Sequence, residues 1–365
     1  MAGGMLTIQP MTALSAETSA KLPNGWLLWH SYSEYSASDS RLYCCTPDGE
    51  IQEISGDFIH AMNGSFGITP NQIVFMAIDA AADEWDIYLY DDGRIQNLTP
   101  NSGFRNEDPK WSPDGRQIVF KRGYWDHSIQ DFVYNLALLE LQTGEITLLT
   151  DDIAEEAMPC FDESGTFIYY TRYFNGIGAI YQMELATGQT KAVYAEEGVN
   201  AYYPIMKRQA LYFTKWFSAD NHCDQLMRLD GDNSMRLPLN SEQYDCSDAC
   251  PIDADRIIYS ATVNGNYDLY FYDGEQSTLL TAQSAPQNDL GADFYAMPEY
   301  EAYLRSTLGD INADGMFDRE DLSLLQRFLL TVPNSDAIDW QAADFTFDGR
   351  LDAADLSLMK QYLFG

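Results

Sequence analysis

Positive charge is scarce in this chain of 365 residues. Lys and Arg together number 21 against 56 Asp and Glu, so the formal net charge is −35. A field of this sign repels nucleic acids and anionic lipid surfaces, and we expect neither as a partner. Long apolar runs are also missing, because no stretch approaches the roughly 18–20 residues that a membrane-spanning helix requires. We therefore expect a globular protein that works in water, away from membranes.

Residue types that carry metal and nucleophile chemistry are sparse too. The sequence has four histidines, without the H-x-x-H or His/Cys spacing of a metal site: His30, His60, His127 and His222. It has no G-x-S-x-G motif, which argues against a serine hydrolase. A metal-dependent lyase with a histidine-rich centre is disfavoured on the same grounds.

The six cysteines do not predict a disulfide framework, because a core of this size does not need one. Cys44 and Cys45 are neighbours in an expected strand and must face opposite sides of it. Only Cys223 and Cys246 fall in expected loops on one face, where a pair is conceivable. We expect free, buried thiols.

Residues 1–24 form either a flexible arm or the remnant of a secretory signal. An apolar stretch there ends in small residues (Ala13, Ser15 and Ala16), as before a signal cleavage site, but a basic front region is missing. Secretion is the expectation, mainly because of the C-terminal module described below.

The body of the chain, residues 25–297, is predicted to be a repeat of four-stranded units. The clearest unit begins at NEDPKWSPDGRQIVF (106–120) and alternates expected strands with tight turns. An aromatic marks the expected second strand of every unit, at intervals of 43 to 50 residues: Trp29, Phe75, Phe120, Tyr170, Phe213 and Tyr259. A turn glycine keeps the same rhythm after the third strand: Gly49, Gly93, Gly144, Gly188, Gly231 and Gly274.

Units of ~45 residues with four strands are typical of β-propeller blades, and six units predict an all-β six-bladed ring. The first unit lacks a local inner strand. The segment NDLGADFYAMP (288–298) is similar to the inner strand of the third unit, so we expect it to close the ring inside the first blade. A five-bladed or open array is the alternative.

The phrase WSPDGRQIVF (111–120) and the strands DIYLY (86–90) and DLYFY (268–272) resemble the TolB-type propeller repeat. Such repeats occur in periplasmic scaffolds, in prolyl-oligopeptidase-like enzymes and in some polysaccharide lyases. The resemblance therefore indicates the fold much better than the function.

Two acidic loops near the C-terminus have the ligand spacing of calcium-binding EF-hand loops, which supply six to eight oxygen atoms. The first loop has its glycine at Gly315, and its expected ligands are Asp310, Asn312, Asp314, the Met316 carbonyl, Asp318 and Asp321. The second starts 34 residues later, with Asp344, Thr346, Asp348, the Arg350 carbonyl, Asp352 and Asp355. The neutral Thr346 hydroxyl predicts weaker binding in this loop. We expect two Ca²⁺ ions and folding coupled to their binding.

Each loop runs into a helix of matching pattern, LSLLQRFLL (322–330) and LSLMKQYLF (356–364). This paired arrangement resembles a type I dockerin over residues 308–365, with 298–307 as a short linker. The resemblance implies a small all-α, calcium-binding module whose partner is a cohesin, in a secreted, cellulosome-type complex. It also assigns partner choice to Arg319 and Glu320 in one copy and Ala353 and Ala354 in the other. Because these pairs differ, we expect one dominant binding orientation.

The function of the propeller is open at this point. Aromatics in the expected loops between second and third strands could stack on sugar rings, with Trp85, Trp125 and Trp216 as the main candidates for binding plant polysaccharide. They could equally pack as small cores between loops. Seven acids are expected near the mouth of the ring, where solvated side chains are the ordinary interpretation: Glu107, Asp108, Glu155, Glu156, Asp245, Asp248 and Asp289. A glycoside hydrolase or lyase, which needs only a suitable carboxylate pair, and a protein-interaction propeller are the alternatives.

Overall fold

The computed structural model describes the chain in segments. These are residues 22, 24–81, 84–217, 223–231, 233–253, 255–281, 287–297, 308–312, 316–330, 340–343, 345 and 351–364. Five expected calcium ligands lie outside the described residues: Asp314, Asp344, Thr346, Asp348 and Arg350. Most of the N-terminal arm and the whole linker lie outside them as well.

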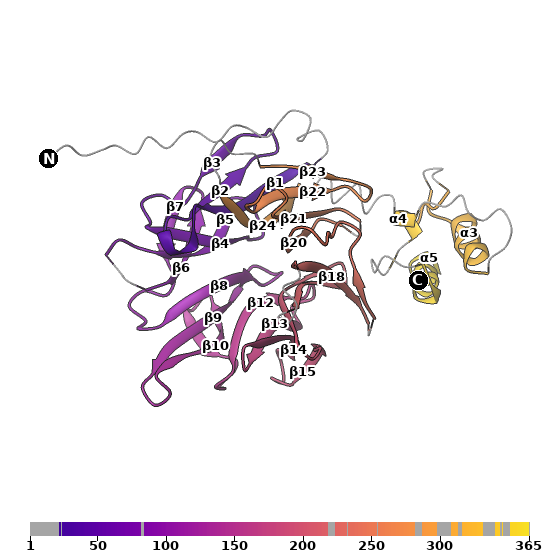
Figure 1. Cartoon of the computed structure of the whole chain (residues 1–365). Helices are drawn as coiled ribbons and strands as arrows, with labels where there is room; N and C mark the ends of the chain where they lie inside the picture. The colour runs from indigo at the N-terminus through magenta and orange to yellow at the C-terminus, as the bar shows by residue number, and fades with distance from the viewer. Residues whose placement is uncertain are drawn as a thin grey trace.

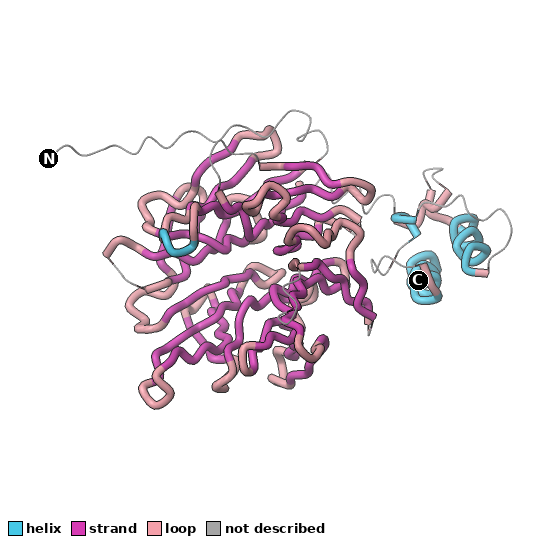
Figure 2. Tube along the Cα trace, in the orientation of Figure 1, coloured by secondary structure: helices cyan, strands magenta, loops and turns pink. Residues whose placement is uncertain are grey.

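The described strands form six four-stranded antiparallel sheets around a common axis (Figures 1 and 2). Blade one contains β24 (Asn288–Ala296), β1 (Gly25–Tyr32), β2 (Arg41–Cys45) and β3 (Ile51–Glu53). Blade two contains β4 (His60–Phe66), β5 (Gln72–Ile78), β6 (Asp86–Asp91) and β7 (Arg94–Asn97). Blade three contains β8 (Arg105–Trp111), β9 (Gln117–Asp126), β10 (Asp131–Glu140) and β11 (Glu145–Leu148).

The remaining blades repeat this order. Blade four contains β12 (Glu155–Phe161), β13 (Phe167–Phe174), β14 (Ile177–Glu184) and β15 (Thr190–Tyr194). Blade five contains β16 (Val199–Lys207), β17 (Ala210–Phe217), β18 (Gln225–Asp230) and β19 (Asn233–Arg236). Blade six contains β20 (Cys246–Pro251), β21 (Ile257–Ala261), β22 (Asp268–Tyr272) and β23 (Ser277–Leu279). A single-turn 3-10 helix, η1 (Tyr35–Ala37), follows β1.

The ring is closed by β24, as the sequence predicted. This strand pairs antiparallel with β1 from Gly25↔Ala296 to Tyr32↔Asn288, with one bulge near His30. The first blade therefore takes its inner strand from the C-terminal end of the propeller and its other three strands from the start. Closure of this kind leaves only the short outer strands as exposed sheet edges.

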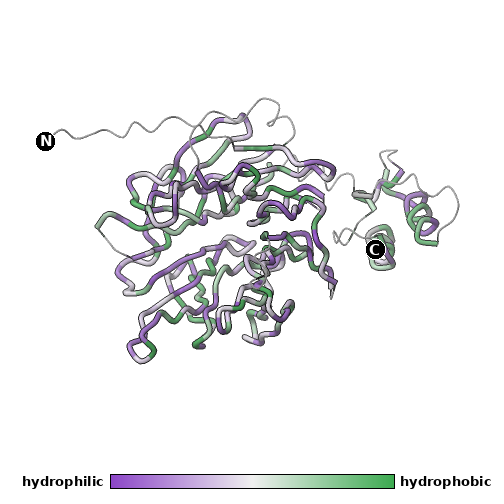
Figure 3. Tube along the Cα trace, viewed as in Figure 1, coloured by the Kyte–Doolittle hydropathy of each residue, from purple (hydrophilic) through white to green (hydrophobic). Residues whose placement is uncertain are grey.

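The repeat markers hold the structure together. All six marker aromatics are at most 1 % exposed and pack between neighbouring sheets. They lie within strands rather than at strand ends, since β1 runs three residues past Trp29 and β9 six residues past Phe120. The six turn glycines all have positive φ, from 57° to 99°, which explains why glycine recurs there. Apolar segments run through the strands of every sheet (Figure 3).

All six cysteines are free thiols in the structure. Cys223 and Cys246 are therefore not paired. Cys44 packs in the core between blades one and two, whereas its neighbour Cys45 packs in the core between blades one and six. Burial raises the pKa of the Cys44 thiol to about 12 and that of Cys45 to about 11. Both thiols are therefore protonated at neutral pH and act as small apolar side chains.

The C-terminal helices form a second unit with a core of their own. Its described helices are α3 (Arg319–Leu329), α4 (Trp340–Ala343) and α5 (Ala353–Phe364). Ile311, Leu325, Phe345 and Met359 form the buried centre between α3 and α5. None of the helices in the described part of the chain has the length and apolarity that crossing a bilayer requires.

Candidate functional site

The inner strand of every blade carries one residue in the left-handed conformation, at a β-bulge. These six residues have φ between 52° and 61° and surround the propeller axis: Asn63, Asp108, Met158, Tyr203, Asp248 and Gly291. Bulges commonly redirect side chains near functional sites. Five blades present a side chain at this position, and blade one presents the Gly291 backbone amide. The sequence pattern does not predict this ring, because its members share backbone conformation rather than residue type.

Two aspartates tie the ring together across blades. The Asp108 carboxylate accepts hydrogen bonds from Asn63 Nδ2 at 2.7 Å and from the Met158 amide at 3.3 Å. The Asp248 carboxylate accepts from the Gly291 amide at 3.1 Å and from Ser247 Oγ at 2.9 Å. Burial raises the pKa of both carboxyl groups. These two acids therefore bridge adjacent blades and are not solvated loop residues.

Most of the other acids expected at the mouth form ion pairs with basic side chains or are buried. Lys121 Nζ lies 3.2 Å from Glu107 and 2.8 Å from Glu155. Glu156 is fully buried, 3.2 Å from the guanidinium of Arg172. The expectation of solvated carboxylates is wrong for Glu107 and Glu156, which are buried against basic side chains, whereas the side chain of Glu155 is 42 % exposed.

A cleft of about 350 Å³ opens where the inner strands of blades four and five begin. It is lined by Met158, Tyr173, Gly176, Asn200, Tyr202, Trp216 and Asp224. The Tyr202 hydroxyl donates to the Asp224 carboxylate at 2.8 Å, and the Tyr267 hydroxyl of blade six donates to it at 3.4 Å. Burial, opposed by the Tyr202 hydrogen bond, raises the pKa of Asp224 to about 6. The cleft thus combines flat aromatic rings with a carboxyl group that titrates near neutral pH.

The three tryptophans proposed for sugar binding have different environments. Trp125 is 44 % exposed and touches the Phe132 ring edge-on, with centroids 5.2 Å apart. Trp216 is half-buried in the cleft. Trp85 is only 4 % exposed and packs on His60, with ring centroids 4.6 Å apart, so its faces are covered.

Several of these aromatics belong to strands and not to loops as expected. Tyr124 and Trp125 end β9, Tyr173 and Phe174 end β13, and Trp216 is in β17. These strands are longer than their apolar segments, so the aromatic rings at their C-terminal ends lie beyond the buried core of the sheet. The cleft residues Asn200 and Tyr202 were missed, because sequence periodicity does not show which end of an inner strand is open.

Two of the histidines lie on adjacent blades and close enough to interact. His30 of β1 and His60 of β4 influence each other electrostatically, and the His60 Nδ1 bonds to the Ser40 hydroxyl. Burial lowers the pKa of His30 to about 3 and that of His60 to about 4. Both rings are therefore neutral and serve the packing between blades one and two.

In the C-terminal unit, the carboxylate that ends each acidic loop also caps the helix that follows. Asp321 is fully buried and accepts from the amides of Ile311 at 2.8 Å, Asn312 at 3.1 Å and Asp318 at 2.8 Å. In the second copy, Asp355 is fully buried and accepts from the Asp352 amide at 2.9 Å. In both copies, one aspartate is thus the last expected ligand of the loop and also a hydrogen-bond acceptor at the start of the helix.

The donor set of the first loop fits a hard cation, because each described ligand residue can offer an oxygen atom, from a carboxylate, the Asn312 amide or the Met316 carbonyl. Within the described residues no three His, Cys, Asp or Glu side chains are gathered as a metal cluster, and Asp314 of this loop is not among them. Arg319 and Glu320 are exposed at the start of α3, and Ala353 and Ala354 are exposed at the start of α5.

The family of the C-terminal unit is decided by its sequence match. Residues 308–364 match the family model described as dockerin type I domain. This segment is a type I dockerin. A type I dockerin implies a cohesin partner in a cellulosome-type assembly, and such domains occur in secreted proteins and generally bind calcium.

The propeller is similar in fold to several solved structures. TolB from Acinetobacter baumannii is 15 % identical, with a TM-score of 0.57, over 74 % of this chain and 66 % of that chain. Hydrazine synthase from Kuenenia stuttgartiensis is 13 % identical, with a TM-score of 0.63, over 80 % and 50 %. Oligogalacturonate lyase from Vibrio parahaemolyticus is 10 % identical, with a TM-score of 0.50, over 76 % and 85 %.

These structural similarities show a shared TolB-like fold. At such low sequence identity they show nothing about activity. The present chain spans about two thirds of the TolB structure and half of the hydrazine synthase chain. No curated protein sequence matches the chain significantly.

Proposed function

We propose that this protein is an extracellular cellulosome-type component whose propeller binds plant polysaccharide while its dockerin holds it to a cohesin. The proposed organisation is an arm at 1–24, the propeller at 25–297, a linker at 298–307 and the dockerin at 308–365. The cohesin side is carried by the dockerin match over residues 308–364.

The calcium ligands proposed for the dockerin are those of the two loops. In the first loop they are Asp310, Asn312, Asp314, the Met316 carbonyl, Asp318 and Asp321. In the second loop they are Asp344, Thr346, Asp348, the Arg350 carbonyl, Asp352 and Asp355. Two Ca²⁺ ions would offset four of the charges of a segment with 11 acids and 4 bases. That neutralisation supports coupling between calcium and folding.

The polysaccharide side rests on the cleft between blades four and five. Trp216 and Tyr173 line it, and Asn200 and Asp224 supply polar groups beside the rings. Trp125 on blade three and Phe174 on blade four are exposed at the same end of the propeller. Sugar rings stack their CH faces on such aromatics, and each stack contributes on the order of 1 kcal/mol beyond area burial. Several weak contacts are useful when a tether adds multivalency.

The proposal is tested by binding of the full chain to insoluble xylan, mannan, glucan and pectin. Trp216→Ala and Trp125→Ala should each weaken retention on one of these polymers, and the double variant should abolish it. Leu148→Ala, which removes an exposed apolar side chain from an outer strand, is the matched control and should bind normally. Unchanged retention of the double variant on every polymer would refute the carbohydrate role.

A second candidate is glycoside hydrolysis, favoured by Asp224. Its pKa of about 6 suits a general acid, and the Asp224 amide donates to the Asp245 carboxylate at 2.9 Å, which places a second acid beside it. Release of reducing ends from a bound polymer, lost in Asp224→Asn, would support hydrolysis. Binding without any product release would leave the propeller as a binding module.

A further inference from the structure

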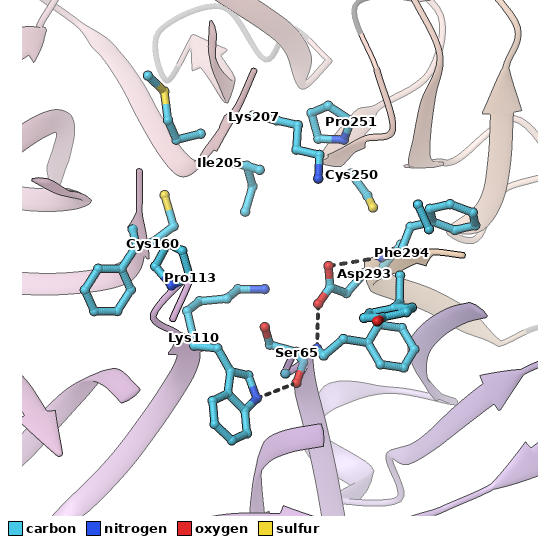
Figure 4. Close-up of a pocket in the computed structure, with 18 of the residues that line it drawn as sticks. Ser65, Lys110, Pro113, Cys160, Ile205, Lys207, Cys250, Pro251, Asp293 and Phe294 are labelled. Atoms are coloured by element: carbon cyan, nitrogen blue, oxygen red, sulfur yellow. Dashed lines mark hydrogen bonds between the residues drawn. The ribbon is translucent and has the colours of Figure 1, made fainter. Parts of the chain in front are cut away.

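A larger cavity, of about 680 Å³, lies on the propeller axis at the opposite end from the aromatic cleft. Strand β16 shows the relation, since Asn200 and Tyr202 near its start line the cleft and Ile205–Lys207 at its end line the cavity. Each blade contributes the residue two positions after its left-handed one: Ser65, Lys110, Cys160, Ile205, Cys250 and Asp293. The cavity wall is thus a second ring, built by the same six strands (Figure 4).

Two lysines project into this cavity. Figure 4 shows the side chains of Lys110, from β8, and Lys207, from β16, both directed toward its centre. Among the described residues neither ammonium has a carboxylate within ion-pair distance. Burial raises the pKa of the Cys250 thiol, and the charges of Lys207 and Lys110 both act against that rise. Both cations therefore act on the same part of the wall.

One carboxylate faces these two cations, and the backbone already satisfies it. Asp293 accepts from the Phe66 amide at 2.8 Å and from its neighbour Phe294 at 3.0 Å. The cavity therefore keeps a surplus of positive charge in a chain whose net charge is −35. Two like charges that share one cavity repel each other, and an anion bound between them removes that cost.

The rest of the wall offers aromatic faces in fixed positions. Trp111 Nε1 donates to the Ser65 carbonyl at 3.1 Å, and the Tyr295 hydroxyl donates to the Ile68 carbonyl at 3.1 Å. Phe66 and Tyr295 meet edge-to-face, with ring centroids 6.0 Å apart. Apolar walls with a few convergent polar groups are typical of sites for small organic ligands, and ~300–1,000 Å³ is their usual volume.

We propose that the axial cavity binds an acidic sugar, a uronic acid within a short oligosaccharide. Its carboxylate would lie between Lys110 and Lys207, and its ring faces would contact Trp111 and Tyr295. The choice of a sugar as the source of the carboxylate rests on the polysaccharide role proposed above. The site itself is separate from the aromatic cleft, because the two open at opposite ends of the inner strands.

The test is calorimetric titration of the full chain with trigalacturonic acid. The comparison ligands are the same trisaccharide with its carboxyl groups reduced to alcohols, ferulate and inorganic phosphate. The variants are Lys110→Met and Lys207→Met, which keep an unbranched side chain, one atom shorter, and remove its charge. Lys191→Met, at an exposed position on β15, is the matched control for loss of one positive charge.

Trigalacturonate should bind, and each cavity variant should lower its affinity about tenfold, the usual worth of a hydrogen bond to a charged group. The control should bind like the parent, and the reduced trisaccharide should not bind. Equal affinity for phosphate or ferulate, or unchanged binding in the Lys110→Met/Lys207→Met double variant, would overturn the proposal. If the parent chain does not bind trigalacturonate but is still retained on neutral glycans through the cleft, this site alone is refuted. The Trp125 and Trp216 variants test the cleft separately.

Discussion

The Tyr202 hydroxyl and the Asp224 carboxylate form a 2.8 Å hydrogen bond that joins the inner strand of blade five to the start of its third strand. Desolvation of Asp224 outweighs this bond, so the pKa of the carboxyl group rises from 3.8 to about 6. The folded protein therefore keeps a proton on Asp224 over a pH range in which the unfolded chain has released it.

This raised pKa predicts a pH-dependent loss of stability. The contribution of Asp224 is fully present below pH ~4 and is lost as the pH rises through about 6. Asp224→Asn, which cannot ionise, should be more stable than the parent at pH 7.5 by at most ~3 kcal/mol, and the two should converge near pH 4. Urea unfolding at several pH values measures this. Parallel stability profiles from pH 4 to 7.5 would contradict the assigned pKa.

Calcium removal should abolish docking. EDTA should eliminate cohesin binding in a pull-down, and added Ca²⁺ should restore it. Asp321→Asn keeps an oxygen for the Ile311 and Asn312 amides, which both donate to Oδ1, but loses the charge and the second oxygen, which accepts from the Asp318 amide. Calcium affinity should therefore fall about tenfold or more. Asp57→Asn makes the same change at an exposed propeller position and should dock normally. Full-strength docking in EDTA would show that the loops do not act through calcium.

The two helix starts of the dockerin should contribute unequally to cohesin binding. Arg319 and Glu320 present a long cation and a carboxylate, whereas Ala353 and Ala354 present only methyl groups. Replacing one pair by the other type should change affinity about tenfold or more at one helix and little at the other, in either order. Surface plasmon resonance with a fixed cohesin measures both exchanges. Small, equal effects would indicate two interchangeable binding modes.

Gly291 should be intolerant of a side chain for two separable reasons. Its φ is +61°, and a Cβ atom there would lie 2.7 Å from the His30 ring. Gly144 also has positive φ, +71°, but a Cβ atom there would meet nothing within 4 Å. Gly291→Ala should therefore lose about 1–3 kcal/mol more stability than Gly144→Ala, the usual range for overpacking. Equal losses of stability in thermal or urea unfolding would mean that the His30 side chain moves aside without cost.

The sequence was sufficient for the blades because their markers are local and repeated. An aromatic such as Phe120 and a turn glycine such as Gly144 each have one physical task in every unit, so their spacing predicts the sheets. The closure by β24 could also be predicted, from the similarity of two segments far apart in the chain.

The sites within the propeller could not be predicted in the same way. The left-handed ring contains Asn, Asp, Met, Tyr and Gly, so no shared letter marks it. Trp85 and Trp216 are the same residue type, but His60 and the core between blades two and three cover the first, whereas the second lies beside a cleft. Lys121 pairs with Glu107 of its own blade and with Glu155 of the next blade, and periodicity within one blade cannot show the second contact.

The closure of the ring by β24 has a mechanical consequence. The strand that completes blade one is also the last described strand before the dockerin. Its end is held by Gly25↔Ala296 pairing and by a bond of 2.9 Å from the Met297 amide to the Asn24 carbonyl. If the dockerin is anchored and a force acts on the propeller, tension enters the ring at this ladder first. The hydrogen bonds between β24 and β1 are then the load-carrying joint between anchor and propeller.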